Sequence, residues 1–310
     1  MTTTTTESNT QKPATDVKRK DIHQQVTDTI IKKLEQGTVP WYRPWIPGTQ
    51  DASYQLPKNY TTGNKYRGIN IVLLWAASQD QQFNSNEWAS FKQWKEIDES
   101  VRENEKGTMI VYYDTVEREE EGEIKHIPFL KHSYVFNRNQ LASYKPDAKV
   151  IEAPRMPLVD RIGAIEDFVA NTKAKVEHDK PMACYSIKED KISMPELSAF
   201  IDTKTCTATE GYYATLMHEL THWTGHASRL DRKLSNKFGD KHYAVEELVA
   251  EMGAAFVCTE FDISKPTKEH HASYIASWLE VLKQNKHAVF TAASEASKAS
   301  EFLHKLQPTV

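Results

Sequence analysis

The stretch His218-Glu219-Leu220-Thr221-His222 determines how the second half of this chain is expected to fold. It has the H-E-x-x-H spacing, in which two histidines hold a zinc ion and the glutamate acts as a base. Residues four apart share one face of an α-helix, so both imidazoles can reach the same ion. Glu219 lies one step around that helix, where it can face a water molecule on the metal. The stretch therefore predicts a helix that carries a catalytic metal site.

An amphipathic helix whose histidines are merely solvated is the alternative explanation of this stretch. The preceding run, residues 212–217, is almost uncharged, so we expect the helix to be largely buried. Buried ionisable groups need partners, and a metal ion supplies one. The context thus favours a metal site.

A catalytic zinc ion needs a third protein ligand beside two histidines and a water molecule. The metzincin pattern would place a histidine at position 228, where this chain has Ser228. His226 is close, but it follows Gly225 directly, and that glycine is expected to end the helix. The third ligand is therefore expected elsewhere.

A second helix is expected over residues 243–256, where apolar residues recur at helical spacing and three carboxylates accompany them. Glu247 and Glu251 are four apart and share a face, which suits a metal ligand followed by an acceptor for a histidine N–H. Glu246 lies one step around, as either a substitute ligand or an ordinary surface charge. One Zn²⁺ is the expected cofactor, with other divalent metals left open.

These groups imply hydrolysis of an amide bond. Zinc lowers the pKa of bound water to about 7 and polarises a carbonyl, while Glu219 passes the proton to the leaving amine. Two short strands, at residues 183–187 and 191–194, are expected upstream, and an edge strand there could pair with an extended peptide. Four side chains are candidates to donate a hydrogen bond to the oxyanion: Tyr243, His226, His242 and Arg229.

Length and composition limit the remaining possibilities. A chain of 310 residues suggests about two domains, and 39 basic residues nearly balance 43 acidic ones. Residues 1–150 carry 20 of each sign, which excludes a strongly basic binding domain. The three cysteines form neither a disulfide framework nor a C-x-x-C pair. No stretch has the length and apolarity of a membrane span or a secretory signal, so we expect a soluble cytoplasmic protein without a membrane partner.

The first half is expected to combine helices with a hairpin. Apolar residues four apart predict a helix over residues 21–37, and residues 68–83 predict a second helix. The capping-box spacing of Asn84 and Glu87 predicts a third helix through Ile97.

Two strands are expected at residues 108–116 and 127–137. The acidic stretch 117–123 between them is expected to be the solvated end of a hairpin. Residues 1–18 are polar and lack apolar periodicity, so they are expected to form a disordered tail.

Cations and aromatic residues are interleaved in two stretches of the first half that contain no acid, residues 52–79 and 124–146. Single-stranded nucleic acid requires this combination, because cations contact phosphates while rings stack on unpaired bases. The alternative is that the rings are core and the cations only aid solubility. The candidate DNA-binding residues are Trp41, Arg43, Trp45, Lys58, Tyr60, Lys65, Tyr66, Arg67, Lys131, Tyr134 and Arg138.

Several strings resemble one known family. Residues 40–45 (PWYRPW), 59–75 (NYTTGNKYRGINIVLLW) and 134–140 (YVFNRNQ) resemble the N-terminal domain of the plasmid antirestriction protein ArdC, a domain also found at the front of some conjugative-plasmid primases. Residues 218–226 (HELTHWTGH), 229–232 (RLDR) and 243–251 (YAVEELVAE) resemble the zincin-like metallopeptidase domain of the same family.

The resemblance implies an α+β protein with a disordered tail (1–18), a domain that binds single-stranded DNA (19–148) and a mainly helical, gluzincin-like metallopeptidase domain with a small sheet (155–310). It also implies protection of incoming plasmid or phage DNA from host restriction in the bacterial cytoplasm. The implied partners are single-stranded DNA and host restriction–modification or other DNA-bound proteins.

Three hypotheses follow. The chain is a peptidase tethered to single-stranded DNA, which raises the effective concentration of proteins on that DNA. Alternatively, it is a non-catalytic DNA-binding protein with a structural or vestigial metal site. In the third case it is a peptidase unrelated to DNA, whose first-half aromatic residues are all core. Glu219 favours the first hypothesis, because a structural metal site needs no general base.

Overall fold

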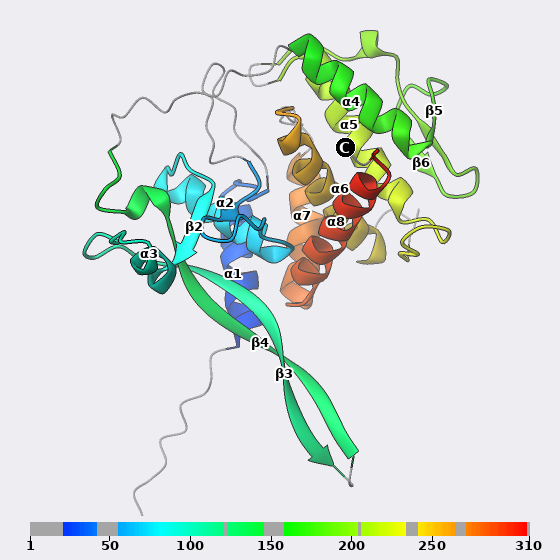
Figure 1. Ribbon diagram of the computed structural model, residues 1–310. Coiled ribbons are helices and arrows are strands. Elements are labelled where there is room, and N and C mark those ends of the chain that lie inside the picture. The colour runs from blue at the N-terminus through cyan, green and yellow to red at the C-terminus, as the bar shows by residue number, and fades with distance from the viewer. Residues whose placement is uncertain are drawn as a thin grey trace, which may run out of the picture.

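The computed structural model describes residues 21–41, 55–120, 123–145, 158–203, 206–233, 241–263 and 271–308. The predicted tail, the predicted domain boundary and the candidates Arg43 and Trp45 lie outside these residues. The chain is α+β, as predicted, with a first half built around one sheet and a mainly helical second half (Figure 1). None of the described helices is both long and apolar enough to cross a membrane.

The first half contains a four-stranded sheet in the order β1-β2-β4-β3. β1 and β2 are parallel, and the other two pairings are antiparallel. Helix α2 packs against β3, while the short helix α3 packs against β2 and β4. The elements are α1 (Ile22–Glu35), β1 (Lys58–Asn59), α2 (Ile69–Gln81), β2 (Glu87–Ser90), α3 (Phe91–Glu96), β3 (Thr108–Glu120), β4 (Glu123–Asn137) and η2 (Arg138–Gln140).

The predicted helix from Asn84 through Ile97 is wrong in its first half, which forms strand β2. Successive strand residues face opposite sides of a sheet, and here both sides are covered. Trp88 packs in the cluster beside α2 and Ala89 packs in the cluster beside α3. The capping box belongs instead to Ser90 and Gln93, which begin α3. Tertiary pairing therefore overrides the local capping signal.

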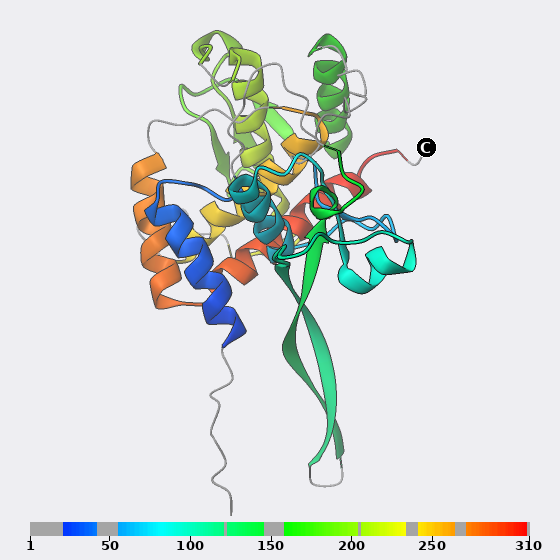
Figure 2. The same cartoon turned by 90° about the vertical axis from the view of Figure 1, so that its left-hand side faces the viewer.

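Strands β3 and β4 form a long hairpin that projects from the rest of the molecule (Figures 1 and 2). Both strands extend further than predicted, because their pairing continues from Thr108 opposite Val135 to Glu120 opposite Glu123. The described part of the acidic stretch, residues 117–120 and 123, lies at the distal end of this hairpin, as predicted, and projects away from the helices of both halves.

The second half is a helical assembly with a three-stranded sheet in the order β5-β7-β6. Strand β6 is at one edge and pairs antiparallel to β7, close to the predicted strand positions. The elements are α4 (Leu158–Thr172), β5 (Lys175–Glu177), β6 (Cys184–Ser186), β7 (Lys191–Ser193), η3 (Leu197–Ala199), α5 (Ala208–Thr224), α6 (Lys241–Glu260), α7 (His271–Gln284) and α8 (Ala288–Lys305).

One hydrophobic core joins the two halves. Trp75 of α2 lies edge-on to Phe256 of α6, with ring centroids 5.7 Å apart. Helix α1 packs along α7, and the two lie side by side in both views (Figures 1 and 2). The shared cluster includes Val26 and Ile30 (α1), Ile71 and Val72 (α2), Leu248, Met252 and Phe256 (α6), Trp278 (α7) and Val289 (α8). The halves therefore form a single packed body.

Candidate metal centre and nucleic-acid surface

The H-E-x-x-H stretch lies on α5, a helix buried along most of its length. A capping box between Thr207 and Glu210 begins this helix, and Gly225 follows its last residue, Thr224. Both motif histidines point the Nε2 atoms of their rings toward one place, with those atoms 3.2 Å apart. Two imidazole nitrogens rarely face each other this closely as mere hydrogen-bond partners. Two nitrogens that bind the same metal ion account for the geometry.

Helix α6 supplies the third group of the cluster. Glu247 places Oε2 3.5 Å from His218 Nε2 and Oε1 3.4 Å from His222 Nε2. Ligands bound tetrahedrally at about 2.0–2.1 Å are separated from one another by about 3.3–3.4 Å. The three separations, which involve both Glu247 oxygens, are close to this spacing, so His218, His222 and Glu247 could together hold one metal ion. Helices α5 and α6 run antiparallel here, because His218 lies beside Glu251 and His222 lies beside Glu246.

Carboxylates behind the histidines select the ring nitrogen that is free for a metal ion. His222 donates from Nδ1 to Glu246 Oε1 at 3.1 Å. His218 Nδ1 lies 3.4 Å from Glu251 Oε1, close enough for charge attraction but outside hydrogen-bond geometry. Glu251 thus lies beside His218, and its role as the acceptor for a histidine N–H stays a prediction.

Glu246 is neither a surface charge nor a ligand in this structure. Its side chain is buried and accepts from His222 on one side and from Arg232 on the other. Arg232 donates to both Glu246 oxygens, at 3.0 and 2.8 Å, and also to the carbonyl of Thr221 and the hydroxyl of Thr224. This arginine, which the sequence analysis did not single out, ties the loop after α5 to α6.

The charge balance of the cluster favours a cation. Burial by itself raises the pKa of Glu247, but hydrogen bonds with His218 and His222 outweigh burial and hold this pKa far below its usual range. Burial by itself lowers the pKa of His222, whereas hydrogen bonds with Glu246 and Glu247 raise it to about 10. In Glu246, bonds to His222 and Arg232 likewise outweigh burial and lower the pKa. The carboxylates therefore stay charged, and a proton or a metal ion must balance them.

A cleft of about 660 Å³ opens onto this cluster. Glu219 lines it beside His218, His222 and Glu247, and strand β6 forms another wall. Tyr243 and Tyr274 also line the cleft. Burial, together with the nearby charge of Glu247, raises the pKa of Tyr243, so its hydroxyl stays protonated. Tyr274, which the sequence analysis missed, comes from α7, whose separation in sequence from the motif left no local signal.

Of the four oxyanion-donor candidates, only Tyr243 lines the described cleft. The ring of His226 bonds to Ser228 instead. Arg229 forms an ion pair with Asp190 and lies over the Trp223 ring, 3.9 Å from its centroid. His242 is exposed and outside the cleft wall. The structure thus places Tyr243 in the cleft wall and the other three candidates outside it.

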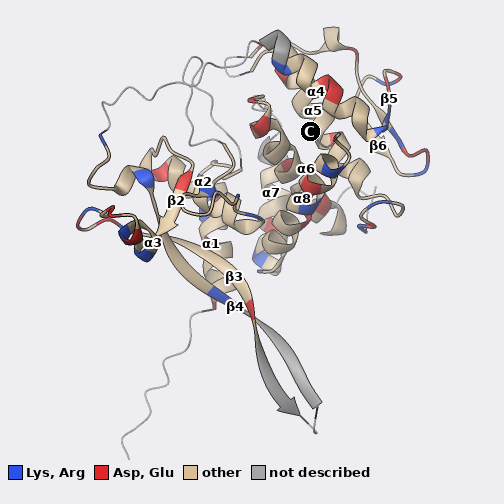
Figure 3. Cartoon of the chain, in the orientation of Figure 1, with Lys and Arg blue, Asp and Glu red and all other residues tan. Residues whose placement is uncertain are grey.

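The described DNA-binding candidates lie in several different environments. Trp41 is 2% exposed and packs edge-on against Trp278, so its ring cannot stack on a base; here the prediction is wrong. Lys131 pairs with Asp114 on the hairpin at 2.5 Å. Lys65 and Arg67 point toward the second half. Charges of both signs are interspersed over the molecule (Figure 3).

Apart from Tyr66, the remaining described candidates form an exposed surface of rings and cations on the α3 side of the sheet. Tyr60 covers Trp94, with centroids 4.9 Å apart, and the Arg138 guanidinium lies 5.5 Å from the Tyr60 ring. Tyr134 is about half exposed on the neighbouring strand, and Lys58 pairs with Glu87. Phe91, at the start of α3, is 56% exposed and was missed by the sequence analysis, which placed it inside a longer helix. Tyr66 is partly buried against the cluster beside α2.

Both halves match known families. Residues 163–295 match the zincin-like metallopeptidase family MPTase-PolyVal, and residues 20–136 match the N-terminal domain of anti-restriction factor ArdC. Two crystal structures of the antirestriction ArdC protein from plasmid R388 are similar over 92% of this chain. The metal-free structure has a TM-score of 0.74 at 37% identity and is covered to 97%; the Mn(II)-bound structure has a TM-score of 0.73 at 36% identity and is covered to 98%.

Relatives are also found among curated proteins. An uncharacterized protein of Sinorhizobium fredii, y4eC, is 35% identical over 296 residues, which span 93% of this chain and 92% of that protein. Two DNA primases TraC of Escherichia coli are 32% and 33% identical over 304 residues. The match spans 92% of this chain but only 20% and 27% of the primases.

Proposed function

The chain belongs to the antirestriction protein family of ArdC, and on that premise we propose that it binds single-stranded DNA and carries a zinc peptidase site. Its role is then to protect incoming plasmid or phage DNA from host restriction. The observation that carries the proposal is the convergence of His218, His222 and Glu247 beside Glu219 in one cleft. The Mn(II)-bound structure of the R388 relative supports a divalent metal in this family.

Each group of the cleft has a distinct task in this proposal. Zinc, when bound by the three ligands, would polarise a carbonyl and acidify water. Glu219 accepts the proton and delivers it to the leaving amine. Tyr243, kept protonated by partial burial and by the charge of Glu247, donates a hydrogen bond to the developing oxyanion. The β6 edge of the cleft pairs with an extended segment of the protein substrate.

The aromatic surface on the α3 side supports the DNA-binding part of the proposal. Tyr60, Phe91 and Tyr134 are exposed there beside the cations Arg138 and Lys58. Large exposed rings next to cations are suited to stacking on unpaired bases while phosphates are neutralised. Host restriction–modification proteins, or other proteins on the same DNA, would then be held near the metal cleft.

A non-catalytic alternative is favoured by one observation, the buried Arg232–Glu246–His222 network. This network ties three segments of the chain together, as a purely structural metal site would. In that case protection comes from coating DNA or blocking the restriction complex.

The variant Glu219→Gln separates the two possibilities because it keeps the three ligands and the shape of the side chain. Under the catalytic proposal, the purified variant keeps its metal and its DNA affinity but loses peptide cleavage, and it no longer protects a plasmid in a restricting host. His222→Ala, which removes a ligand, serves as the metal-free control. Full protection by Glu219→Gln together with loss of protection by His222→Ala would instead assign the metal a structural role.

A further inference from the structure

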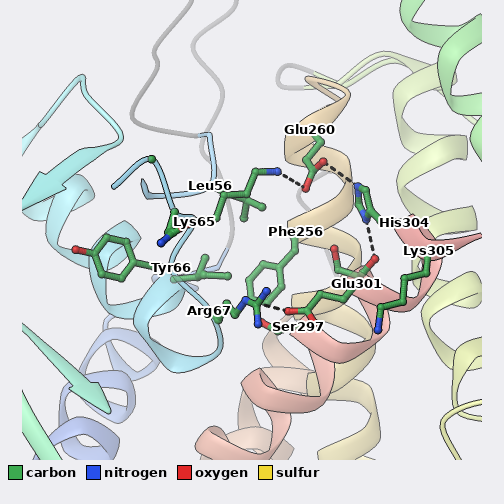
Figure 4. Close-up of a pocket in the computed structure, with 14 residues that line it drawn as sticks. Leu56, Lys65, Tyr66, Arg67, Phe256, Glu260, Ser297, Glu301, His304 and Lys305 are labelled. Atoms are coloured by element: carbon green, nitrogen blue, oxygen red, sulfur yellow. Dashed lines mark hydrogen bonds and ion pairs between the residues drawn. The ribbon is translucent and has the colours of Figure 1, made fainter. Parts of the chain in front are cut away.

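A groove of about 740 Å³ lies where the loop before α2 meets α6 and α8 (Figure 4). It is distinct from the metal cleft and from the aromatic surface on the α3 side. Its walls come from both halves of the chain and include charged side chains of both signs. The charged and imidazole side chains of its lining are Lys65, Arg67, Glu260, Glu301, His304 and Lys305.

Two ion pairs cross this groove. Lys65 Nζ lies 3.2 Å from Glu260 Oε1, and Arg67 Nε lies 3.2 Å from Glu301 Oε1 (Figure 4). His304 donates from Nε2 to the second oxygen of Glu260 at 2.9 Å, and this bond raises the pKa of the imidazole. The side chains of Lys65 and Arg67 remain 59% and 75% exposed. Both cations can therefore be approached from solvent while they are paired.

These ion pairs are not what holds the halves together. Exposed pairs of this kind stabilise a fold only slightly, and salt screens them. The shared hydrophobic core, with Phe256 beside Trp75, already fixes α6 against α2. An exchange of ionic partners in the groove thus requires side-chain rotation only, and the halves need not separate.

A second hollow, of about 640 Å³, continues past the Arg67–Glu301 pair. Both hollows share Arg67, Ser297 and Glu301 in their linings, so the pair forms a constriction in one longer path. Tyr113 and Lys298 line the far hollow. From Ser294 to Lys305 the path follows α8 for about 16 Å, given the helical rise per residue. Cations and aromatic rings line both ends of this path.

We propose that this groove binds the backbone of single-stranded DNA, and that its phosphates replace Glu260 and Glu301 as the partners of Lys65 and Arg67. The inference rests on the proposed DNA binding and adds a path for the strand together with a pair of built-in competitors. A single small anion must displace a carboxylate that is already in place. A polynucleotide offers several phosphates at once, so it displaces both carboxylates in one binding event.

The position of Glu260 links this path to the metal cleft. Glu260 ends α6, the helix that also carries Glu247. The two residues are separated by about 20 Å along the helix axis. A DNA strand in the groove would therefore pass about one length of α6 away from the metal cleft.

The test measures anisotropy of a labelled oligothymidylate bound to the full, zinc-loaded chain at several salt concentrations. The double variant Glu260→Gln/Glu301→Gln removes the competitors and should tighten binding about three- to tenfold. Lys65→Ala/Arg67→Ala should weaken binding and reduce the slope of log K against log salt by about 0.7 per cation. In that background, the glutamine substitutions should have little further effect.

A matched control uses two ion pairs whose residues line neither hollow. Lys283 pairs with Glu35 at 2.6 Å, and Lys175 pairs with Glu177 at 3.0 Å. The variant Glu35→Gln/Glu177→Gln makes the same change in net charge. It should change DNA affinity by less than about twofold, since no phosphate is expected there.

The outcomes separate the inference from the function it rests on. Equal tightening by the groove variant and the control variant would reduce the effect to net charge and overturn the inference. Unchanged affinity in the groove variant, with wild-type binding intact, would also overturn it. No detectable binding by the wild-type chain at low salt would instead remove the proposed DNA binding. Thermal unfolding of every variant checks that each is folded.

Discussion

Gly253 of α6 lies directly against Thr221 of α5. A methyl group at Gly253 would come within 2.6 Å of Thr221 Cγ2 and 3.0 Å of its hydroxyl oxygen. Thr221 is fully buried and bonded to the carbonyl of Met217, so it has little room to move. The close approach of the two helices at this point sets the distance between the histidines of α5 and Glu247.

Gly253→Ala should therefore push α5 and α6 apart. We expect the free energy of unfolding to fall by about 1–3 kcal/mol, as for other overpacked cores, and metal affinity to fall with it. Gly163→Ala on α4 is the matched control, because a methyl group there meets nothing within 4 Å. That control should stabilise the chain by about 0.5–1 kcal/mol. Urea unfolding and zinc titration measure both; equal behaviour of the two variants would contradict the argument.

Glu246→Ala should weaken metal binding although Glu246 is not a ligand. The substitution leaves His222 without the acceptor that orients its ring and leaves Arg232 buried without its carboxylate partner. Loss of such a partner typically reduces metal affinity by about 10–100-fold. Competition with a chromophoric chelator measures the effect, and Glu280→Ala, at an exposed position on α7, is the control. Unchanged affinity in Glu246→Ala would show that the acceptor does not orient the imidazole.

Metal binding should release protons and strengthen as pH rises. The pKa of His222 is raised to about 10, so the metal-free ring holds its proton at neutral pH and a cation must displace it. Calorimetry in buffers of different ionisation enthalpy should show about one proton released per ion between pH 7 and 9. A proton count near zero across this range would contradict the prediction.

The raised pKa of His222 has the opposite pH dependence for the stability of the metal-free protein. A raised histidine pKa contributes stability that is full below about pH 6.5 and is lost as pH rises toward 10. The lowered pKa of Glu247 contributes stability above about pH 4.5 that is lost on acidification. Metal-free protein should thus become less stable between pH 7 and 10, while zinc-loaded protein should not. Urea midpoints of both forms at several pH values test this difference.

Phe91→Ala and Trp41→Phe should have opposite effects on DNA binding and stability. Phe91 is exposed on the α3 surface, so its removal should cost about 1–3 kcal/mol of binding to single-stranded DNA and little stability. Trp41 is buried against Trp278, so Trp41→Phe should lower stability and leave DNA affinity unchanged. Anisotropy and urea unfolding of the two variants measure both effects. If only Trp41→Phe lost DNA affinity, the DNA would bind somewhere other than the α3-side surface.

Local periodicity explains which parts of the site were predictable from the sequence. Spacings of four place His218 with His222, and Glu247 with Glu251, and each pair depends on a single helix. The place of Glu246 depends on Arg232, which reaches it from a loop, so no spacing on α6 could reveal the contact.

Tertiary contacts explain what the sequence could not supply in the first half. The capping-box spacing of Asn84 and Glu87 is typical of a helix start. Pairing with β1 and β4 nevertheless makes this segment a strand. Composition groups Trp41 with Tyr60, although one ring is core and the other lies on the surface. The burial of Trp41 depends on Trp278 of α7, which is more than half the chain away in sequence.

Helix α6 serves both halves, with its carboxylates on the metal side and Phe256 in the core shared with α2. A chain built this way cannot vary the spacing between a bound strand and the metal as two domains on a flexible tether would. The fold itself fixes the distance between the groove and the metal cleft. Any polypeptide cleaved by such a molecule would be selected by how far it sits from the nucleic acid, before its own sequence is considered.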